Sequence, residues 1–171
     1  MVTQTERRTA TKEAIVSAAI QQYLTAGNIE VSLDTVALEA GVAKATILYH
    51  FESRMGLLGA VADRLLEEFL ERIGPIEQFD SPLGGIRAYL EQGLEPTASL
   101  FTQVSDALTY AGQASITTGL DLLVEALRLG GVTETPVVVA AAMQTMIRQI
   151  SFGYVDAKGI DRFIMEIAHM L

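Results

Sequence analysis

The chain has 171 residues, of which 50% are apolar and 19% are charged, and its formal net charge is −9. This composition excludes a disordered protein, and the absence of cysteine excludes a disulfide scaffold and any cysteine-ligated metal site. The longest uncharged run, Ala14 to Ile29, is too short and too polar to span a membrane, and the first residues show no apolar leader. We therefore expect a cytoplasmic protein whose large apolar fraction is buried in an oligomer interface or a ligand cavity.

Apolar residues recur at helical spacing along the whole chain, and no strand-like alternation is present, so the sequence predicts an all-α fold. The first helix is expected from Ala10 to Ala26, with Gly27 as its C-terminal cap. Ser32 is the predicted N-cap of a short second helix, and Ala43 to His50 form a third. Three helices this close in sequence make sense as one small trihelical unit.

Six further helices are expected after Phe51, because glycine and proline residues divide the remaining chain into helical segments. Their expected extents are Leu57 to Gly74, a weaker segment from Ser81-Pro82, Pro96 to Ala111, Ile116 to Leu129, Thr135 to Tyr154, and a terminal helix from Ile160 to Leu171, which Gly159 separates from the helix before it.

The segment from Ser32 to Arg54 has the pattern of a helix-turn-helix. Gly41 can adopt the positive φ that a sharp turn between two helices requires, and Ala37 is small where the helices would cross. Val36, Ala40, Val42 and Ile47 are expected on the inner face, which leaves Lys44, Ala45, Leu48 and Tyr49 on the outer face. The second helix of such a unit enters the major groove of DNA.

The run Gly41-Val42-Ala43-Lys44-Ala45-Thr46-Ile47-Leu48-Tyr49-His50-Phe51 resembles the recognition-helix signature of the tetracycline-repressor (TetR) family, G-V-S-K-G/A-T-L-Y-x-Y/H-F. The resemblance covers about residues 9 to 62. It implies a helix-turn-helix DNA-binding domain over 1–53, followed by a dimerisation and ligand-binding domain over 54–171. It also implies a homodimer that represses transcription from palindromic operators until a small, apolar effector releases it.

From this resemblance we expect the DNA contacts to come from the second and third helices and the start of the fourth. The residues expected to contact DNA are Ser32, Lys44, Ala45, Thr46, Leu48, Tyr49, His50 and Arg54. Lys44, Ala45 and Thr46 would read bases, although they could also be an ordinary exposed helix start. Tyr49 and His50 would contact phosphates, although one of them could instead pack against the fourth helix.

Most of the net negative charge lies outside the unit that is expected to bind DNA. Residues 1–54 hold five basic and six acidic side chains, a net charge of −1, so residues 55–171 hold −8. We expect DNA binding to depend on a few placed cations and to show a modest salt dependence. Arg7 and Arg8 could reach the DNA as a flexible arm or could belong to a solvated tail.

The C-terminal part carries two weaker predictions. A dimer interface is expected on the last two helices, at Val139, Met143, Met146, Ile147, Ile150, Tyr154, Phe163 and Ile167. A ligand pocket is expected on the middle helices, lined by Tyr89, Phe101, Gln103, Tyr110, Gln113 and Met143. The methionine-rich stripe could serve either purpose.

No motif for catalysis, for a metal or for a cofactor is present. Glu166 and His169 have the E-x-x-H spacing of di-iron bundles, but the only other histidine is His50, so a second such pair cannot form. We therefore expect no enzyme activity. The alternative to a DNA-binding regulator is a helical ligand-binding or scaffolding protein whose helix-turn-helix contacts another protein.

Overall fold

The computed structural model describes residues 3–74, 79–113, 124, 127–128, 131–132 and 136–168, and every regular element in this part of the chain is helical. The predicted all-α fold is confirmed. In chain order the elements are α1 Gln4–Ala26, α2 Leu33–Glu39, α3 Lys44–Phe51, α4 Arg54–Ile73, α5 Pro82–Glu91, the 3-10 helix η2 Gln92–Leu94, α6 Pro96–Tyr110, α8 Pro136–Ser151 and α9 Ala157–Ile167.

Helix α1 begins six residues earlier than expected, at Gln4 rather than Ala10. A capping box explains this start: the Glu6 backbone N–H donates to Thr3 Oγ1 at 3.2 Å, and the Thr3 N–H donates to Glu6 Oε2 at 2.5 Å. These two hydrogen bonds also lower the pKa of Glu6. Arg7 and Arg8 consequently lie on a regular helix, which corrects the expectation of an arm or a tail.

Most other helix ends lie where the sequence predicts them. Gly27 ends α1 with φ 68°, and Ser32 Oγ caps α2 by accepting the Thr35 N–H at 3.1 Å. Ser81 caps α5, whose first residue is Pro82, and Pro96 opens α6.

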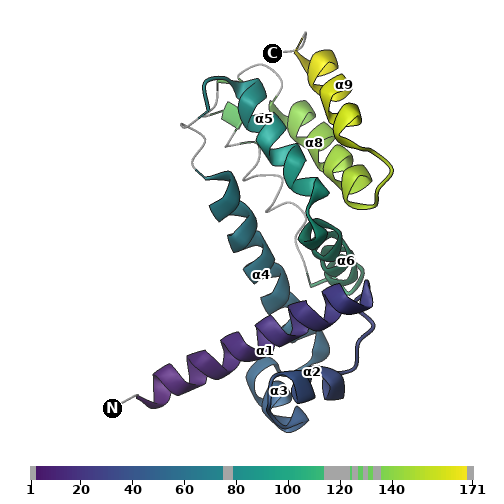
Figure 1. Cartoon of the computed structure of the whole chain (residues 1–171). Helices are drawn as coiled ribbons and strands as arrows, with labels where there is room; N and C mark the ends of the chain where they lie inside the picture. Colours follow the sequence, from purple (N-terminus) through teal and green to yellow (C-terminus); the bar gives the residue numbers. More distant parts are fainter. Residues whose placement is uncertain are drawn as a thin grey trace.

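Two hydrophobic cores occupy opposite ends of the molecule. Figure 1 shows α1, α2 and α3 at one end and α5, α8 and α9 at the other, with α4 and α6 between them. The N-terminal core is formed by Ile15, Val16, Ala18, Ala19, Tyr23, Val36, Ala37, Ile47, Phe51, Leu57, Leu58, Val61, Leu65, Leu100, Val104 and Leu108. The C-terminal core is formed by Ile86, Leu90, Val124, Leu127, Val132, Val139, Ala140, Met143, Ile150, Ile160, Ile164 and Ile167.

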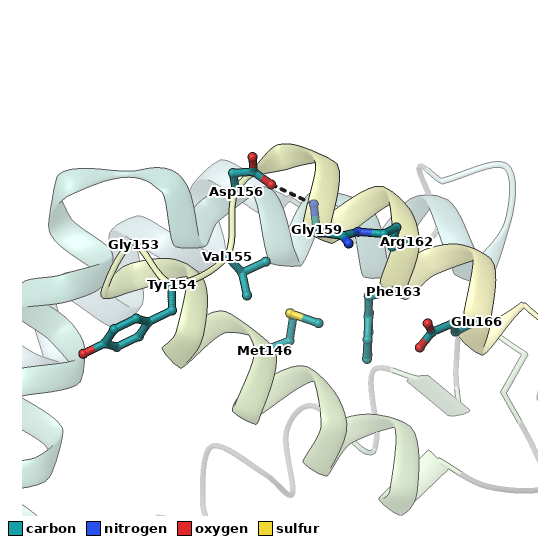
Figure 2. Close-up of a pocket in the computed structure, with 9 residues that line it drawn as sticks. All are labelled: Met146, Gly153, Tyr154, Val155, Asp156, Gly159, Arg162, Phe163 and Glu166. Carbon is teal, nitrogen blue, oxygen red and sulfur yellow. Dashed lines mark hydrogen bonds between the residues drawn. The ribbon is translucent and has the colours of Figure 1, made fainter.

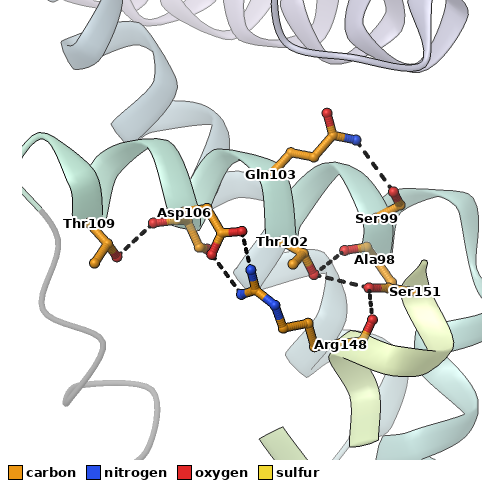
Figure 3. A network of polar contacts seen from close by, with 9 residues as sticks. Ala98, Ser99, Thr102, Gln103, Asp106, Thr109, Arg148 and Ser151 are labelled. Carbon is orange, nitrogen blue, oxygen red and sulfur yellow. Dashed lines mark hydrogen bonds and ion pairs between the residues drawn. The ribbon is translucent and has the colours of Figure 1, made fainter. Parts of the chain in front are cut away.

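Helix α6 joins these two cores. Its buried residues, Leu100, Val104 and Leu108, belong to the N-terminal core and pack with α4 and α1. Asp106 on the same helix pairs with Arg148 of α8 at 2.5 Å, and the hydroxyls of Thr102 and Ser151 lie 3.2 Å apart (Figure 3). The N-terminal core therefore extends across the boundary expected near residue 53, into α4 and α6.

The last two helices differ from their expected limits. Helix α8 ends at Ser151, so Tyr154 lies in the connection after it, with 77% of its surface exposed. Helix α9 begins at Ala157, because the Asp156 carboxylate accepts the Gly159 N–H at 2.9 Å and caps its first turn. Gly159 is thus part of α9 and does not separate it from α8.

None of the helices among the described residues is long and apolar enough to cross a membrane. The expected helix from Ile116 to Leu129 lies outside the described residues, apart from three isolated positions, and so does His169.

Candidate functional site

Helices α2 and α3 form a helix-turn-helix around Gly41. Gly41 has φ 65°, the positive value that the turn was predicted to need. The turn is closed by backbone hydrogen bonds from Gly41 N–H to the Leu38 carbonyl at 3.2 Å and from Val42 N–H to the Ala37 carbonyl at 3.0 Å. The direction of α3 relative to α2 is therefore fixed by backbone geometry.

The inner face of this unit is buried as predicted. Val36 and Ile47 are fully buried in the N-terminal core, Ala37 is 4% exposed, and Ala40 and Val42 pack against the same core. Such packing holds α3 rigidly against α2 and α1.

The outer face of α3 is exposed, also as predicted. Lys44, Ala45, Leu48 and Tyr49 are all accessible, and Tyr49 is 70% exposed. Thr46 is partly buried. Ala43 occupies the N-cap position without a side-chain hydrogen bond, so α3 lacks the usual hydroxyl cap.

Two cations of this unit are held by carboxylates. Lys44 Nζ lies 2.8 Å from Asp34 Oδ2 of α2, and both side chains are exposed. Arg54 lies 3.8 Å from Glu30 and donates to the Ile29 carbonyl, so it ties the start of α4 to the loop before α2. Sequence reasoning missed both pairings, because they depend on the angle between helices rather than on a residue spacing.

Two cations of α1 lie beside the C-terminal end of α3 instead. The Arg8 guanidinium lies 5.8 Å from the centre of the Tyr49 ring, and Lys12 Nζ lies 5.9 Å from the centre of the Phe51 ring. Neither forms an ion pair with a carboxylate among the described residues. Uncompensated positive charge therefore lies along α1, next to Tyr49.

His50 is partly buried between α1, α3 and α4. It shares an open pocket with Lys12 of α1 and with Gly56 and Asp63 of α4, and its Nδ1 is buried without a hydrogen-bond partner among the described residues. Burial, and then the positive charges of Arg8 and Lys12, lower the pKa of His50. Of the pair Tyr49 and His50, it is His50 that turns toward α4.

The structure does not bring the six expected pocket residues together. Phe101 packs on the N-terminal core and Met143 lies inside the C-terminal core. Gln103 hydrogen-bonds Ser99 within α6, at 3.4 Å. The Tyr89 and Phe69 rings form a T-shaped pair with their centres 5.2 Å apart. Burial raises the pKa of Tyr89 to about 12, although part of its surface is accessible.

Tyr110 and Gln113 are corrections to the expected pocket. Tyr110 is 97% exposed at the end of α6, and Gln113 is exposed in the turn that follows. Both project from the surface, because α6 buries the Leu100-Val104-Leu108 face instead.

The expected dimer interface also needs correction. Val139, Met143, Ile150 and Ile167 are at most 3% exposed, because α5, α8 and α9 of the same chain cover them. A second copy of the chain cannot contact them without opening this core. Ile147, which was also expected in the dimer interface, is only partly buried and packs on the same core. The exposed apolar neighbours on α8 and α9 are Val137, Val138 and Met165.

An open pocket of about 510 Å³ lies where α8, α9 and their connection meet (Figure 2). Met146, Tyr154 and Phe163, all three from the expected interface, line it. Arg162 and Glu166 of α9 add one charge of each sign. Within the described part of the chain, no group of three or more His, Asp or Glu side chains could hold a metal ion.

Residues 15–61 match the family model described as "Bacterial regulatory proteins, tetR family". This segment contains the whole helix-turn-helix and the start of α4. The match supports the interpretation of the chain as a tetR-family bacterial regulatory protein. The resemblance noted in the sequence is thereby confirmed, and the family is one of helix-turn-helix transcriptional regulators.

Curated relatives agree with the tetR assignment. The HTH-type transcriptional regulator RutR of Escherichia coli (strain K12) is 34% identical over 86 residues, which cover 50% of this chain and 41% of RutR, and RutR of Shigella flexneri matches equally. The chain thus spans less than half the length of these relatives.

Solved structures share the fold over nearly the whole chain. The multidrug binding protein EbrR, complexed with imidazole, has a TM-score of 0.76 at 17% identity and covers 95% of this chain and 92% of its own. A TetR-family transcriptional regulator from Pectobacterium atrosepticum has a TM-score of 0.68 at 21% identity, covering 99% and 95%. AibR, in complex with isovaleryl coenzyme A and operator DNA, has a TM-score of 0.59 at 16% identity, covering 94% and 97%.

Proposed function

We propose that this tetR-family protein binds double-stranded DNA as a homodimer and represses transcription from palindromic operators. The observation that carries the proposal is the contrast between the two faces of α3. Its inner face is packed into the N-terminal core, and its outer face presents Lys44, Ala45, Leu48 and Tyr49 to solvent. A rigid helix with a free outer face suits the major groove of B-DNA.

Three exposed side chains of α3, Lys44, Leu48 and Tyr49, have chemically suitable partners on DNA. The Lys44 ammonium can donate to guanine O6 and N7, and Leu48 can contact a thymine methyl group. Ala45 and Thr46 lie near the start of α3, where base edges are read. The hydroxyl of Tyr49, whose ring centre lies 5.8 Å from the Arg8 guanidinium, could donate to a phosphate.

The remaining residues of the expected DNA site have mainly supporting roles in this proposal. Ser32 caps α2, and Arg54 is engaged by Glu30 and the Ile29 carbonyl. Both therefore hold the elements that carry α3. His50 can reach a phosphate only on the side that does not face α4.

We propose that dimerisation uses the outer surface of α8 and α9, where Val137, Val138 and Met165 are each more than half exposed. Burying these side chains against a second copy would remove apolar area from water. Met146, Phe163 and Tyr154, around the open pocket, extend the same region. Two-fold symmetry would then place one α3 in each half of a palindrome.

We further propose that a small, apolar effector bound in the C-terminal part releases the DNA. EbrR is described with imidazole, and AibR with isovaleryl coenzyme A and operator DNA, on the same fold. A ligand acts only if it binds the DNA-incompetent conformation better than the competent one. Helices α4 and α6 connect the two cores, so a change in the C-terminal core would reach α3 through these two helices.

Selection of duplexes from a random pool by the purified protein, at one stated salt concentration, tests this function. We expect a palindrome whose half-sites are about one helical turn apart, roughly 10 base pairs between centres. Enrichment of no sequence would contradict the proposal. A ligand screen on the selected operator then tests release: the effector must lower operator affinity without dissociating the dimer.

Lys44 and Arg54 are already engaged by carboxylates, which makes the unit less attractive to phosphates. This favours one alternative, a scaffolding protein whose helix-turn-helix contacts another protein. The double substitution Lys44→Ala and Tyr49→Ala separates the two functions. A DNA-binding protein loses its operator complex and keeps its oligomeric state, whereas the scaffolding alternative has no operator complex to lose.

A further inference from the structure

We propose that Asp34 is a specificity-determining residue for DNA recognition. By holding Lys44 and cancelling its charge, its carboxylate weakens binding to DNA of any sequence and leaves the base contacts of α3 to decide affinity. This inference rests on the proposed DNA binding. It assigns to α2 a part in sequence discrimination, although α2 itself does not present the reading face.

The position of Asp34 is fixed by the structure of α2. It lies in the first turn, which Ser32 caps through the Thr35 N–H at 3.1 Å and the Thr35 hydroxyl at 2.9 Å. A negative side chain is favoured at this end of a helix by the helix dipole. The short turn at Gly41 then brings the first residue of α3, Lys44, within 2.8 Å of the Asp34 carboxylate.

The ion pair between Asp34 and Lys44 changes which end of α3 presents positive charge to DNA. Lys44 is the only Lys or Arg residue of α3, so Asp34 neutralises the beginning of the recognition helix. Arg8 and Lys12 of α1, which form no ion pair among the described residues, lie beside the other end of α3. Attraction to phosphates is independent of sequence, so a neutral start of α3 removes attraction that every duplex would share.

The same contact orients Lys44 for reading a base. An ammonium has three donors, and one directed at Asp34 leaves two for guanine O6 and N7. With Asp34 replaced, Lys44 regains its rotamer freedom and can move to the nearest phosphate. Loss of the carboxylate should therefore strengthen binding to unrelated DNA more than binding to the operator.

The test compares Asp34→Asn with Glu39→Gln, because both substitutions remove one negative charge from α2. Glu39 is a matched control, since its carboxylate accepts from Gln22 of α1 at 2.9 Å and, within the described part of the chain, forms no ion pair with α3. Fluorescence anisotropy would measure the affinity of each protein for the selected operator and for a scrambled duplex over a range of salt concentrations. Asp34→Ser provides a second replacement, and thermal unfolding checks that all variants fold.

We expect Asp34→Asn and Asp34→Ser to raise affinity for the scrambled duplex by about two- to five-fold. The operator-to-scrambled ratio should fall, and the salt slope should steepen by about one per protomer. In a Lys44→Ala background the same substitution should leave the ratio unchanged.

Equal effects of Asp34→Asn and Glu39→Gln would overturn the inference, as would an unchanged ratio. In either case the wild-type protein still prefers its operator, so the proposed function stands. A wild-type protein that binds no duplex selectively rejects the proposed function and this inference together.

Discussion

In the proposed complex with DNA, single side chains determine how the N-terminal unit attracts phosphates despite its net charge of −1. Asp34 and Glu30 engage Lys44 and Arg54, while Arg8 and Lys12 remain available beside α3. General electrostatic attraction is therefore concentrated at the α1 side of the unit.

His50 should make DNA binding dependent on pH. Burial and the charges of Arg8 and Lys12 lower the pKa of His50, so its imidazole is neutral at pH 7 in the free protein. A phosphate bound near Arg8 and Lys12 would offset their charge and favour the protonated form. The complex then takes up a proton, so operator affinity should rise several-fold between about pH 7.5 and about pH 6.

Titrations of wild type and His50→Gln at several pH values check this expectation. The variant should show a flatter pH dependence and should otherwise keep its operator preference. If wild type and variant respond identically to pH, another group is responsible.

At the level of elements, the junction between α3 and α4 sets the direction of the recognition helix. Ser53 Oγ accepts the Gly56 N–H at 3.0 Å, and a Cβ atom at Gly56 would overlap the carbonyl oxygen of Phe51. Gly56→Ala must therefore push α3 and α4 apart. We expect a loss of about 1–3 kcal/mol in the free energy of unfolding, measured in urea.

Gly59→Ala is the matched control on the same helix, because a Cβ there meets no atom within 4 Å. Alanine is the better helix former, so this variant should gain up to about 1 kcal/mol. Equal stability of the two variants would show that the junction between α3 and α4 accommodates a Cβ atom at residue 56, and would contradict this prediction.

Helix ends were largely predictable from sequence, because caps act over three or four residues. Ser32, Gly41 and Pro96 are examples. The early start of α1 was predictable too, since Thr3 and Glu6 have the capping-box spacing, but apolar periodicity alone placed it at Ala10. The pair of Asp34 and Lys44 was not predictable, because it depends on the angle that the turn imposes.

For the whole molecule, two cores joined by α4 and α6 suit a protein that couples a C-terminal event to α3. The sequence predicted the buried stripe of α8 but not what covers it. Val139, Met143 and Ile150 are covered by the same chain, since periodicity identifies an apolar face and says nothing about its partner.

The proposed interface on the outer surface of α8 and α9 gives a prediction about assembly. Val138→Asp and Met165→Asp place a charge on side chains that are 59% and 62% exposed in one copy. Both variants should fold, and sedimentation velocity should show them shifted from dimer toward monomer. Leu38→Asp, at an 83% exposed position on α2, should stay dimeric. Dimers of all three variants would place the interface elsewhere.

The affinity of the Lys44→Ala/Tyr49→Ala double variant for the selected operator tests most directly the claim that the outer face of α3 reads DNA. With dimerisation and thermal unfolding unchanged, we expect at least an approximately 100-fold loss of operator affinity and little remaining preference over a scrambled duplex. A folded, dimeric double variant that binds the operator as tightly as wild type would contradict the account.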